Sequence, residues 1–185
     1  MLPSLTRFAA VALLVCAPAF AEPQGGHHHS KHFFARLKVG EALPEFHLTR
    51  LDGTPIDNKA LQGYTLVSFY FAECEPCVKE VPLLNALAER RPDLHLLAFT
   101  FDSAKETKEF VAKHGLAWPI VTDAGKLTEN IGVKAYPTMA LFDRKGELVE
   151  VMVNRAQLGN PGAFDAWLYT VTFNHDRSSF GRRGL

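Results

Sequence analysis

Hydrophobic positions along the chain follow two patterns, which predict strands and helices in alternation. Short, nearly continuous hydrophobic runs predict strands that are buried on both faces. These runs are residues 66–71, 94–101, 119–121, 139–142 and 148–153. Hydrophobic positions at helical spacing predict helices at 78–90, 104–114, 127–131 and 161–173. The stretch from Phe46 alternates hydrophobic and polar residues up to Asp52-Gly53, which predicts a hairpin.

The order of these elements predicts one α/β domain. Strands and helices alternate from residue 66 to residue 131, which is typical of parallel strands joined by crossover helices. The last two strands flank residues 143–146, a turn that adds an antiparallel hairpin to the edge of the sheet. About 100–200 residues usually form one domain, so a chain of 185 residues favours a single one.

Composition excludes some classes of protein. The 20 lysines and arginines balance 20 aspartates and glutamates, so the chain lacks the basic excess that is typical of nucleic-acid binders. Three cysteines are too few for a disulfide-dense scaffold. A hydrophobic fraction of 47% is ordinary for a globular domain. We therefore expect no nucleic-acid partner.

The first 21 residues have the pattern of a secretory signal peptide. Arg7 precedes a hydrophobic run over residues 8–19, which is short for a membrane span, and an A-F-A cleavage sequence ends at Ala21. Cleavage there predicts a periplasmic or secreted protein. The alternative is a lipoprotein acylated at Cys16. Val15 disfavours it, because lipoprotein signals resemble one another in having a small residue before that cysteine.

The remaining chain divides into a leader, a domain and a tail. Residues 22–37 are expected to form a flexible leader, residues 38–173 the domain, and residues 174–185 a solvated basic tail. The leader carries four histidines that are candidate metal ligands, although a solvated tail is the favoured interpretation. They are His27, His28, His29 and His32.

Cleavage leaves two cysteines, Cys74 and Cys77, in one C-E-P-C motif between a predicted buried strand and a predicted helix. The free N–H groups and the dipole at a helix start favour the thiolate of Cys74. Cys77, one turn later, is placed to attack a mixed disulfide at Cys74. Pro76 is tolerated because the first helical turn needs no N–H there. An oxidising compartment allows the two cysteines to form a disulfide.

Other roles of this cysteine pair are less well supported. A disulfide across four residues constrains little chain, which disfavours a purely structural bridge. Zinc needs two further ligands, and the sequence has no second C-x-x-C. Copper(I) accepts two thiolates, so weak copper binding together with a histidine stays open. Redox chemistry is the favoured interpretation, with no cofactor beyond the pair itself.

Four segments share motifs with a known family. They are F-A-E-C-E-P-C at 71–77 followed by K-E-V-P, an entry segment at 40–46, an extra strand and helix within 94–123, and Tyr136-Pro137-Thr138. Together they resemble the thioredoxin-like thiol–disulfide oxidoreductases of bacterial envelopes, in particular the ResA and TlpA group. The resemblance covers residues 38–170. It implies a thioredoxin-like fold with an N-terminal β-hairpin and a central strand–helix insertion.

The resemblance also implies roles for individual residues. Cys74 is expected to be the nucleophile and Cys77 the resolving thiol. Glu80, which shares a helix face with Cys77, is expected to exchange protons with the cysteines. The alternative for Glu80 is a surface glutamate that pairs with a lysine.

A second group of residues is expected to bind the substrate. In the family, the loop opposite the cysteines carries a cis-proline, which corresponds to Pro137 here. The backbone of the residue before that proline, here Tyr136, lies alongside an extended substrate. Thr138 completes this predicted substrate-binding loop.

Three glutamates near the motif predict tuning of the cysteines. Glu75 opposes the helix dipole and is expected to raise the pKa of Cys74, which makes the dithiol a better reductant. Glu73 stands where the family usually has tryptophan, and Ser68 where thioredoxin has a buried acid. Glu73, Glu75 and Glu80 therefore predict an acidic surface around the cysteines, here called the acidic mouth. Such a surface suits a specific, basic or metal-bearing partner.

The resulting hypothesis is a periplasmic reductase of client disulfides, recharged by a membrane thiol donor. Maturation of c-type cytochromes and assembly of copper centres are the implied settings. One alternative is a copper(I)-binding chaperone. A peroxiredoxin-type peroxidase is a weaker alternative, because such enzymes need threonine or serine where this chain has Phe71.

Overall fold

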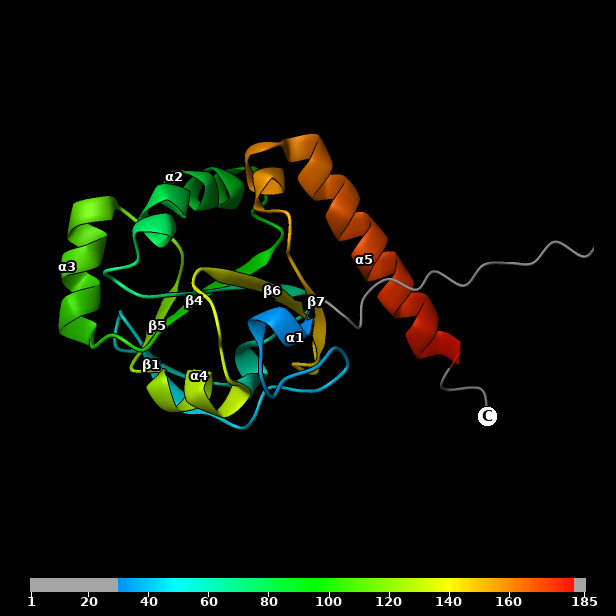
Figure 1. The fold of residues 1–185 in the computed structure, drawn as a ribbon, viewed down its shortest axis with the longest axis horizontal. Helices are drawn as coiled ribbons and strands as arrows, with labels where there is room; N and C mark the ends of the chain where they lie inside the picture. The colour runs from blue at the N-terminus through cyan, green and yellow to red at the C-terminus, as the bar shows by residue number, and fades with distance from the viewer. Residues whose placement is uncertain (1–29, 182–185) are drawn as a thin grey trace, which may run out of the picture.

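The computed structural model describes residues 30–181, which form a seven-stranded sheet with helices on both faces (Figure 1). The strands are β1 (His47–Arg50), β2 (Pro55–Asp57), β3 (Thr65–Tyr70), β4 (His95–Thr100), β5 (Ile120–Thr122), β6 (Thr138–Phe142) and β7 (Leu148–Val151). Their order in space is β2-β1-β5-β4-β3-β6-β7. Strands β3, β4 and β5 run parallel, whereas the other neighbouring pairs are antiparallel.

Helices α2, α3 and α5 cover one face of the sheet, while α4 and the segment after α1 cover the other (Figure 1). The α-helices are α1 (Ser30–Phe33), α2 (Glu75–Arg90), α3 (Ala104–His114), α4 (Gly125–Ile131) and α5 (Pro161–Gly181). Two short 3-10 helices complete the described elements, η1 (Asn58–Ala60) and η2 (Arg155–Gly159).

Strand β3 lies near the centre of the sheet, and all six of its residues are buried. Leu66 and Tyr70 belong to the core beneath α2, whereas Val67 and Phe69 belong to the core on the opposite face. Successive side chains of a strand alternate between faces, so one continuous hydrophobic run supplies both cores. This arrangement fixes the loop that leaves β3 and carries the cysteines.

The predicted order of strands and helices is confirmed. The predicted strands and helices between residues 66 and 153 lie within a few residues of their observed bounds. The expected N-terminal hairpin is β1 with β2, in which Leu48 faces Ile56. Helix α3 begins with a capping box in which Ser103 and Glu106 bind one another's backbone N–H groups, and it ends at Gly115 with φ of 72°.

The prediction of a flexible leader up to residue 37 is wrong for residues 30–37. Phe34 is 1% exposed and packs edge-on against Phe69, with ring centroids 5.7 Å apart. The N–H of Ala35 donates to the carbonyl of Gly132 at 2.7 Å. A Cβ on Gly132 would lie 2.7 Å from the Cβ of Ala35, so this close approach requires glycine. The segment is ordered because its hydrophobic side chains cover the open face of the sheet.

The prediction of a solvated tail from residue 174 is wrong for His175 and Asp176, which contact the domain, whereas Arg177 and Ser178 are exposed. Helix α5 continues to Gly181 instead of ending near residue 173. The Tyr64 hydroxyl donates to the Asp176 carboxylate at 2.6 Å, and His175 Nε2 lies 3.2 Å from Asp143 Oδ2. These contacts, made to residues far away in the sequence, hold the polar last turns of the helix on the domain.

The predicted signal peptide, His27, His28, His29 and the last two arginines lie outside the described residues. His32 lies within them and is exposed. Between residues 30 and 181, no helix combines the length and the hydrophobicity that crossing a bilayer requires.

Candidate active site

The two cysteines lie at the start of α2, directly after the loop that leaves β3. Cys74 is the N-cap residue, with extended backbone at φ −78° and ψ 98°, and Cys77 lies in the first turn. The two form a disulfide with their Cα atoms 5.2 Å apart. The N–H of Cys77 donates to the sulfur of Cys74 at 3.2 Å. This cap gives the Cys74 sulfur the position in which a helix start stabilises negative charge.

The rest of the first turns of α2 follows the predicted pattern. Pro76 stands in the first turn, where its missing N–H removes no helical bond. Both cysteines are only 4% exposed, and their neighbours Glu75 and Pro76 are exposed. The indole of Trp118 donates to the carbonyl of Leu84 at 2.8 Å, which fixes the middle of α2 on the domain.

The predicted loop opposite the cysteines contains a cis peptide bond between Tyr136 and Pro137. It leads into β6, where Thr138 pairs with Phe69 of β3, so the loop lies beside the chain that approaches Cys74. Tyr136 and Pro137 are half-buried, whereas Thr138 is fully buried and its hydroxyl donates to the carbonyl of Ala135 at 2.7 Å. The side chain of Thr138 therefore holds the loop from inside, and Tyr136 and Pro137 form its accessible surface.

Tyr136 belongs to an aromatic cluster with Phe71 and Phe101. Its ring meets Phe71 at 5.3 Å and Phe101 at 5.7 Å, both edge-on, while the two phenylalanines stack at 5.4 Å. The hydrophobic pattern predicts Phe101 as the end of a buried strand, but this residue follows β4 and is 43% exposed. The cluster joins the loop that carries the cis peptide bond to the segment three residues before Cys74.

Glu80 pairs with Arg155, a residue that the sequence patterns do not single out. Arg155 is the first residue of η2, and its Nη2 donates to the carboxylate of Glu80. Its Nη1 donates to the carbonyl of Pro137 at 2.6 Å. The guanidinium therefore bridges α2 and the loop that carries the cis peptide bond. The alternative of a surface glutamate paired with a lysine is wrong, because the side chain of Glu80 is only 14% exposed and its partner is an arginine.

The acidic mouth carries less net negative charge than its sequence suggests. Lys79 pairs with Glu75 at 2.6 Å, one turn along the exposed face of α2, and this hydrogen bond holds the pKa of Glu75 below its usual value. Glu80 is paired with Arg155. Glu73 is exposed beside Cys74. Two of the three predicted carboxylates thus have a cation alongside, which weakens the expected effect of Glu75 on the pKa of Cys74.

Asp102 is a further residue near the site that the sequence patterns do not indicate. It lies just beyond β4, and its Oδ2 accepts hydrogen bonds from the N–H of Ala72 and the hydroxyl of Thr100, both at 2.6 Å. Ala72 is two residues before Cys74, so Asp102 fixes the loop that carries the nucleophile. Its position beyond the carboxyl end of a parallel strand, where sites of α/β proteins lie, is the signal that could have indicated it.

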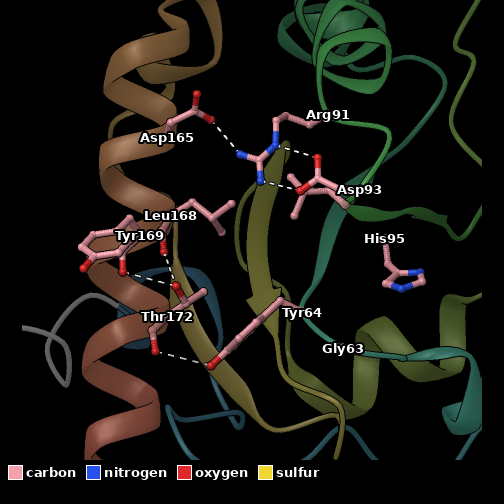
Figure 2. Close-up of a pocket in the computed structure, with 10 residues that line it drawn as sticks. Gly63, Tyr64, Arg91, Asp93, His95, Asp165, Leu168, Tyr169 and Thr172 are labelled. Carbon is pink, nitrogen blue, oxygen red and sulfur yellow. Dashed lines mark hydrogen bonds and ion pairs between the residues drawn. The ribbon is translucent and has the colours of Figure 1, made fainter.

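Figure 2 shows a different pocket, of about 430 Å³, which lies beside α5 and the starts of β3 and β4. Arg91 in this pocket pairs with Asp93 and Asp165, both at 2.7 Å. Six residues of β3, about 20 Å at 3.3 Å per residue, separate this end of the sheet from the loop that leads to Cys74. The pocket therefore lies away from the redox-active pair.

The described residues contain no group of three or more histidine, cysteine, aspartate or glutamate side chains placed to hold a metal ion. Three of the four leader histidines lie outside residues 30–181, so copper binding stays a prediction.

Comparisons with known proteins show the family to which the chain belongs. The sequence profile of the Redoxin family matches residues 38–163. Thiol-disulfide oxidoreductase ResA of Bacillus anthracis is 34% identical over 130 residues, which are 65% of this chain and 75% of that protein. ResA of a Bacillus cereus strain is 30% identical over 152 residues, 77% of this chain and 84% of that protein.

A solved structure supports the fold. The crystal structure of the thioredoxin domain of a thiol-disulfide oxidoreductase from Bacteroides vulgatus superposes with a TM-score of 0.60 at 24% identity. The match covers 68% of this chain and 95% of that domain. With a family profile over most of the chain, curated relatives of the same activity and a shared fold, this protein belongs to the Redoxin family and is a thioredoxin-like thiol–disulfide oxidoreductase of the ResA type.

Proposed function

We propose that this protein is a periplasmic reductase of client disulfides, exported after signal cleavage near Ala21 and recharged by a membrane thiol donor. Its clients would belong to cytochrome c maturation or copper-centre assembly. The observation that carries the proposal is the Cys74–Cys77 disulfide at the start of α2, beside the loop with the cis peptide bond. The reaction needs no cofactor beyond this cysteine pair.

The reaction is thiol–disulfide exchange in two steps. The Cys74 thiolate of the reduced protein attacks one sulfur of the client disulfide, and the other client sulfur leaves as a thiolate that takes up a proton. Cys77 then loses its proton, and its sulfur attacks the mixed disulfide at Cys74. The second client sulfur leaves, and the Cys74–Cys77 disulfide forms again. Two electrons pass from the protein to the client.

The cap at Cys74 supports its role as the nucleophile. The helix start and the N–H of Cys77 both favour negative charge on the Cys74 sulfur. A helix start contributes at most about 2 kcal/mol, which lowers a thiol pKa by about 1.5 units. Glu73, which is exposed beside Cys74, adds negative charge nearby, so the stabilisation of the thiolate is modest. Modest stabilisation favours a reductant over a strong oxidant.

Glu80 is the candidate acceptor for the proton of Cys77. It lies three residues after Cys77 on α2, so the two side chains share a face of the helix. The carboxylate is mostly buried, which keeps water away from the proton transfer. We propose that Glu80 takes the proton of Cys77 during the second step.

The midpoint potential of the Cys74–Cys77 couple tests the direction of electron flow. Equilibration of the mature protein in thiol–disulfide buffers, followed by mass-spectrometric counting of thiols, gives this potential. We expect a value near that of thioredoxin, about −270 mV, which makes the dithiol a reductant. A value near about −120 mV, as in DsbA, would instead identify an oxidant.

Serine variants test the roles of the two cysteines. We expect Cys77→Ser to accumulate a mixed disulfide with a disulfide-containing peptide, because no second thiol resolves it. Cys74→Ser should lose the reductase activity and trap nothing. Gel shift and mass spectrometry of the trapped species check both outcomes. Retention of activity in Cys74→Ser would contradict the assignment of the nucleophile.

A further inference from the structure

The side chain of Arg155 joins two parts of the site that lie far apart in the sequence. It is 75 residues from Glu80 and 18 from Pro137, and its guanidinium donates to both. One donor group faces the carboxylate that follows the cysteines on α2, and the other faces the backbone of the loop with the cis peptide bond. The side chain itself is mostly buried.

We propose that Arg155 is a positioning residue that keeps Glu80 ionised and fixed beside the cysteine pair. The inference rests on the proposed function, because it concerns the carboxylate that is to accept the proton of Cys77. A guanidinium in direct contact with a carboxylate favours its charged form. Glu80 is then available as a base at neutral and mildly acidic pH.

A purely structural role explains the arrangement less well. Burial of an ion pair costs desolvation energy, and such pairs are often no more stabilising than hydrophobic residues in the same place. The Nε of Arg155 is buried and has no hydrogen-bond partner, which adds to that cost. Burial lowers the pKa of Arg155 to about 10, so the cation is kept at neutral pH. The ion pair of Arg155 and Glu80 is costly to bury and lies at the redox site. Control of the ionisation of Glu80 therefore explains it better than stabilisation of the fold.

The other charged groups near Glu80 do not replace Arg155. On its own helix, Lys79 is exposed and pairs with Glu75, and Cys77 is neutral in the disulfide. From the facing loop, Pro137 offers only its carbonyl, which is bound by Arg155. Among the described residues, Arg155 is thus the cation that pairs with Glu80.

The test measures the pH dependence of the reaction in the full mature protein. Reduced protein is mixed with a peptide that contains one intramolecular disulfide, and the release of peptide thiols is followed by stopped flow. The wild-type rate should fall first as the Cys74 thiolate takes up a proton, and fall again at more acidic pH as Glu80 takes up a proton. In Arg155→Ala the midpoint of this second fall should rise by about one to three pH units. Arg155→Lys, which keeps a cation, should show a smaller shift.

Three further variants show whether the effect passes through Glu80. Glu80→Gln should keep the fall caused by Cys74 but lose the second, more acidic fall, and adding Arg155→Ala to it should cause no further shift. Arg90→Ala is the matched control, because Arg90 is another arginine with buried, unpaired nitrogens, at the far end of α2. It should leave the midpoint unchanged. The same midpoint in Arg155→Ala and wild type, or an equal shift in the Glu80→Gln background, would overturn the inference.

A direct titration separates this inference from the proposed function. Carbon-13 NMR of the glutamate carboxyls, assigned with Glu80→Gln, gives the pKa of Glu80 without any turnover. A raised pKa in Arg155→Ala and Arg155→Lys relative to wild type, larger in the alanine variant, supports the effect of Arg155 on Glu80. Absence of peptide reduction by the wild type would reject the proposed function alone, whereas an unchanged pKa would reject the inference alone.

Discussion

Asp102 fixes the approach to the nucleophile through the backbone. Its carboxylate accepts the N–H of Ala72 at 2.6 Å, although the two residues are 30 positions apart. The same oxygen accepts the hydroxyl of Thr100. The bond to Thr100 is local, but the bond to Ala72 has no local sequence signal, because the position of Asp102 after a parallel strand marks the residue and not its partner. Contacts of this kind decide the geometry of a site that the C-E-P-C motif merely locates.

Replacing Asp102 with alanine should destabilise the oxidised protein by about 1–3 kcal/mol, because the N–H of Ala72 loses its partner. Thermal unfolding followed by circular dichroism measures the change, which should lower Tm by several degrees. Glu109→Ala is the control on neighbouring α3, where an exposed glutamate is expected to cost less than about 0.5 kcal/mol. Equal Tm values for the two variants would show that this bond contributes little.

At the scale of elements, the periodic segments could be predicted and the irregular ones could not. Strand β3 has a continuous hydrophobic run and helix α3 has hydrophobic residues at helical spacing. Each pattern fits within a dozen residues, so a short window of sequence is enough to predict the element. The segment after α1 has only a short hydrophobic stretch around Phe34, and its order depends on packing against Phe69 and pairing with Val133. No window of sequence contains those partners. The last turns of α5 are likewise polar and held by Tyr64 and Asp143.

Phe34→Ala tests whether the segment after α1 is part of the core. We expect a loss of about 3–5 kcal/mol in the free energy of unfolding, as for other buried phenylalanines. Chemical denaturation of the oxidised protein measures it. Phe33→Ala is the matched control, because Phe33 is only half-buried and its replacement should cost clearly less. A loss below about 0.5 kcal/mol for Phe34→Ala would instead support the prediction that this segment is a flexible leader.

At the scale of the molecule, the sequence was sufficient for the fold class and for the cysteine pair, but not for the surroundings of the pair. The alternation of strands and helices predicts the parallel centre of the sheet, because crossover connections leave few topologies. Arg155 could not be predicted, since it begins the short 3-10 helix η2 and its partner Glu80 lies 75 residues earlier in the chain. The pairing of Glu75 with Lys79 was readable from their spacing of four residues, yet its effect on the acidic mouth became clear only in the structure.

The position of the end of α5 relative to the disulfide decides where the protein can be attached to a support. Strand β6 begins beside the cysteines and ends at Phe142, so Asp143 and its partner His175 of α5 lie at the end of the sheet remote from the disulfide. The end of α5 therefore lies at the end of the sheet that is remote from the redox-active face. A support or reporter protein coupled at the end of α5 would leave the face that carries the disulfide free, so this end of the helix is a suitable point of attachment for capturing clients on a column.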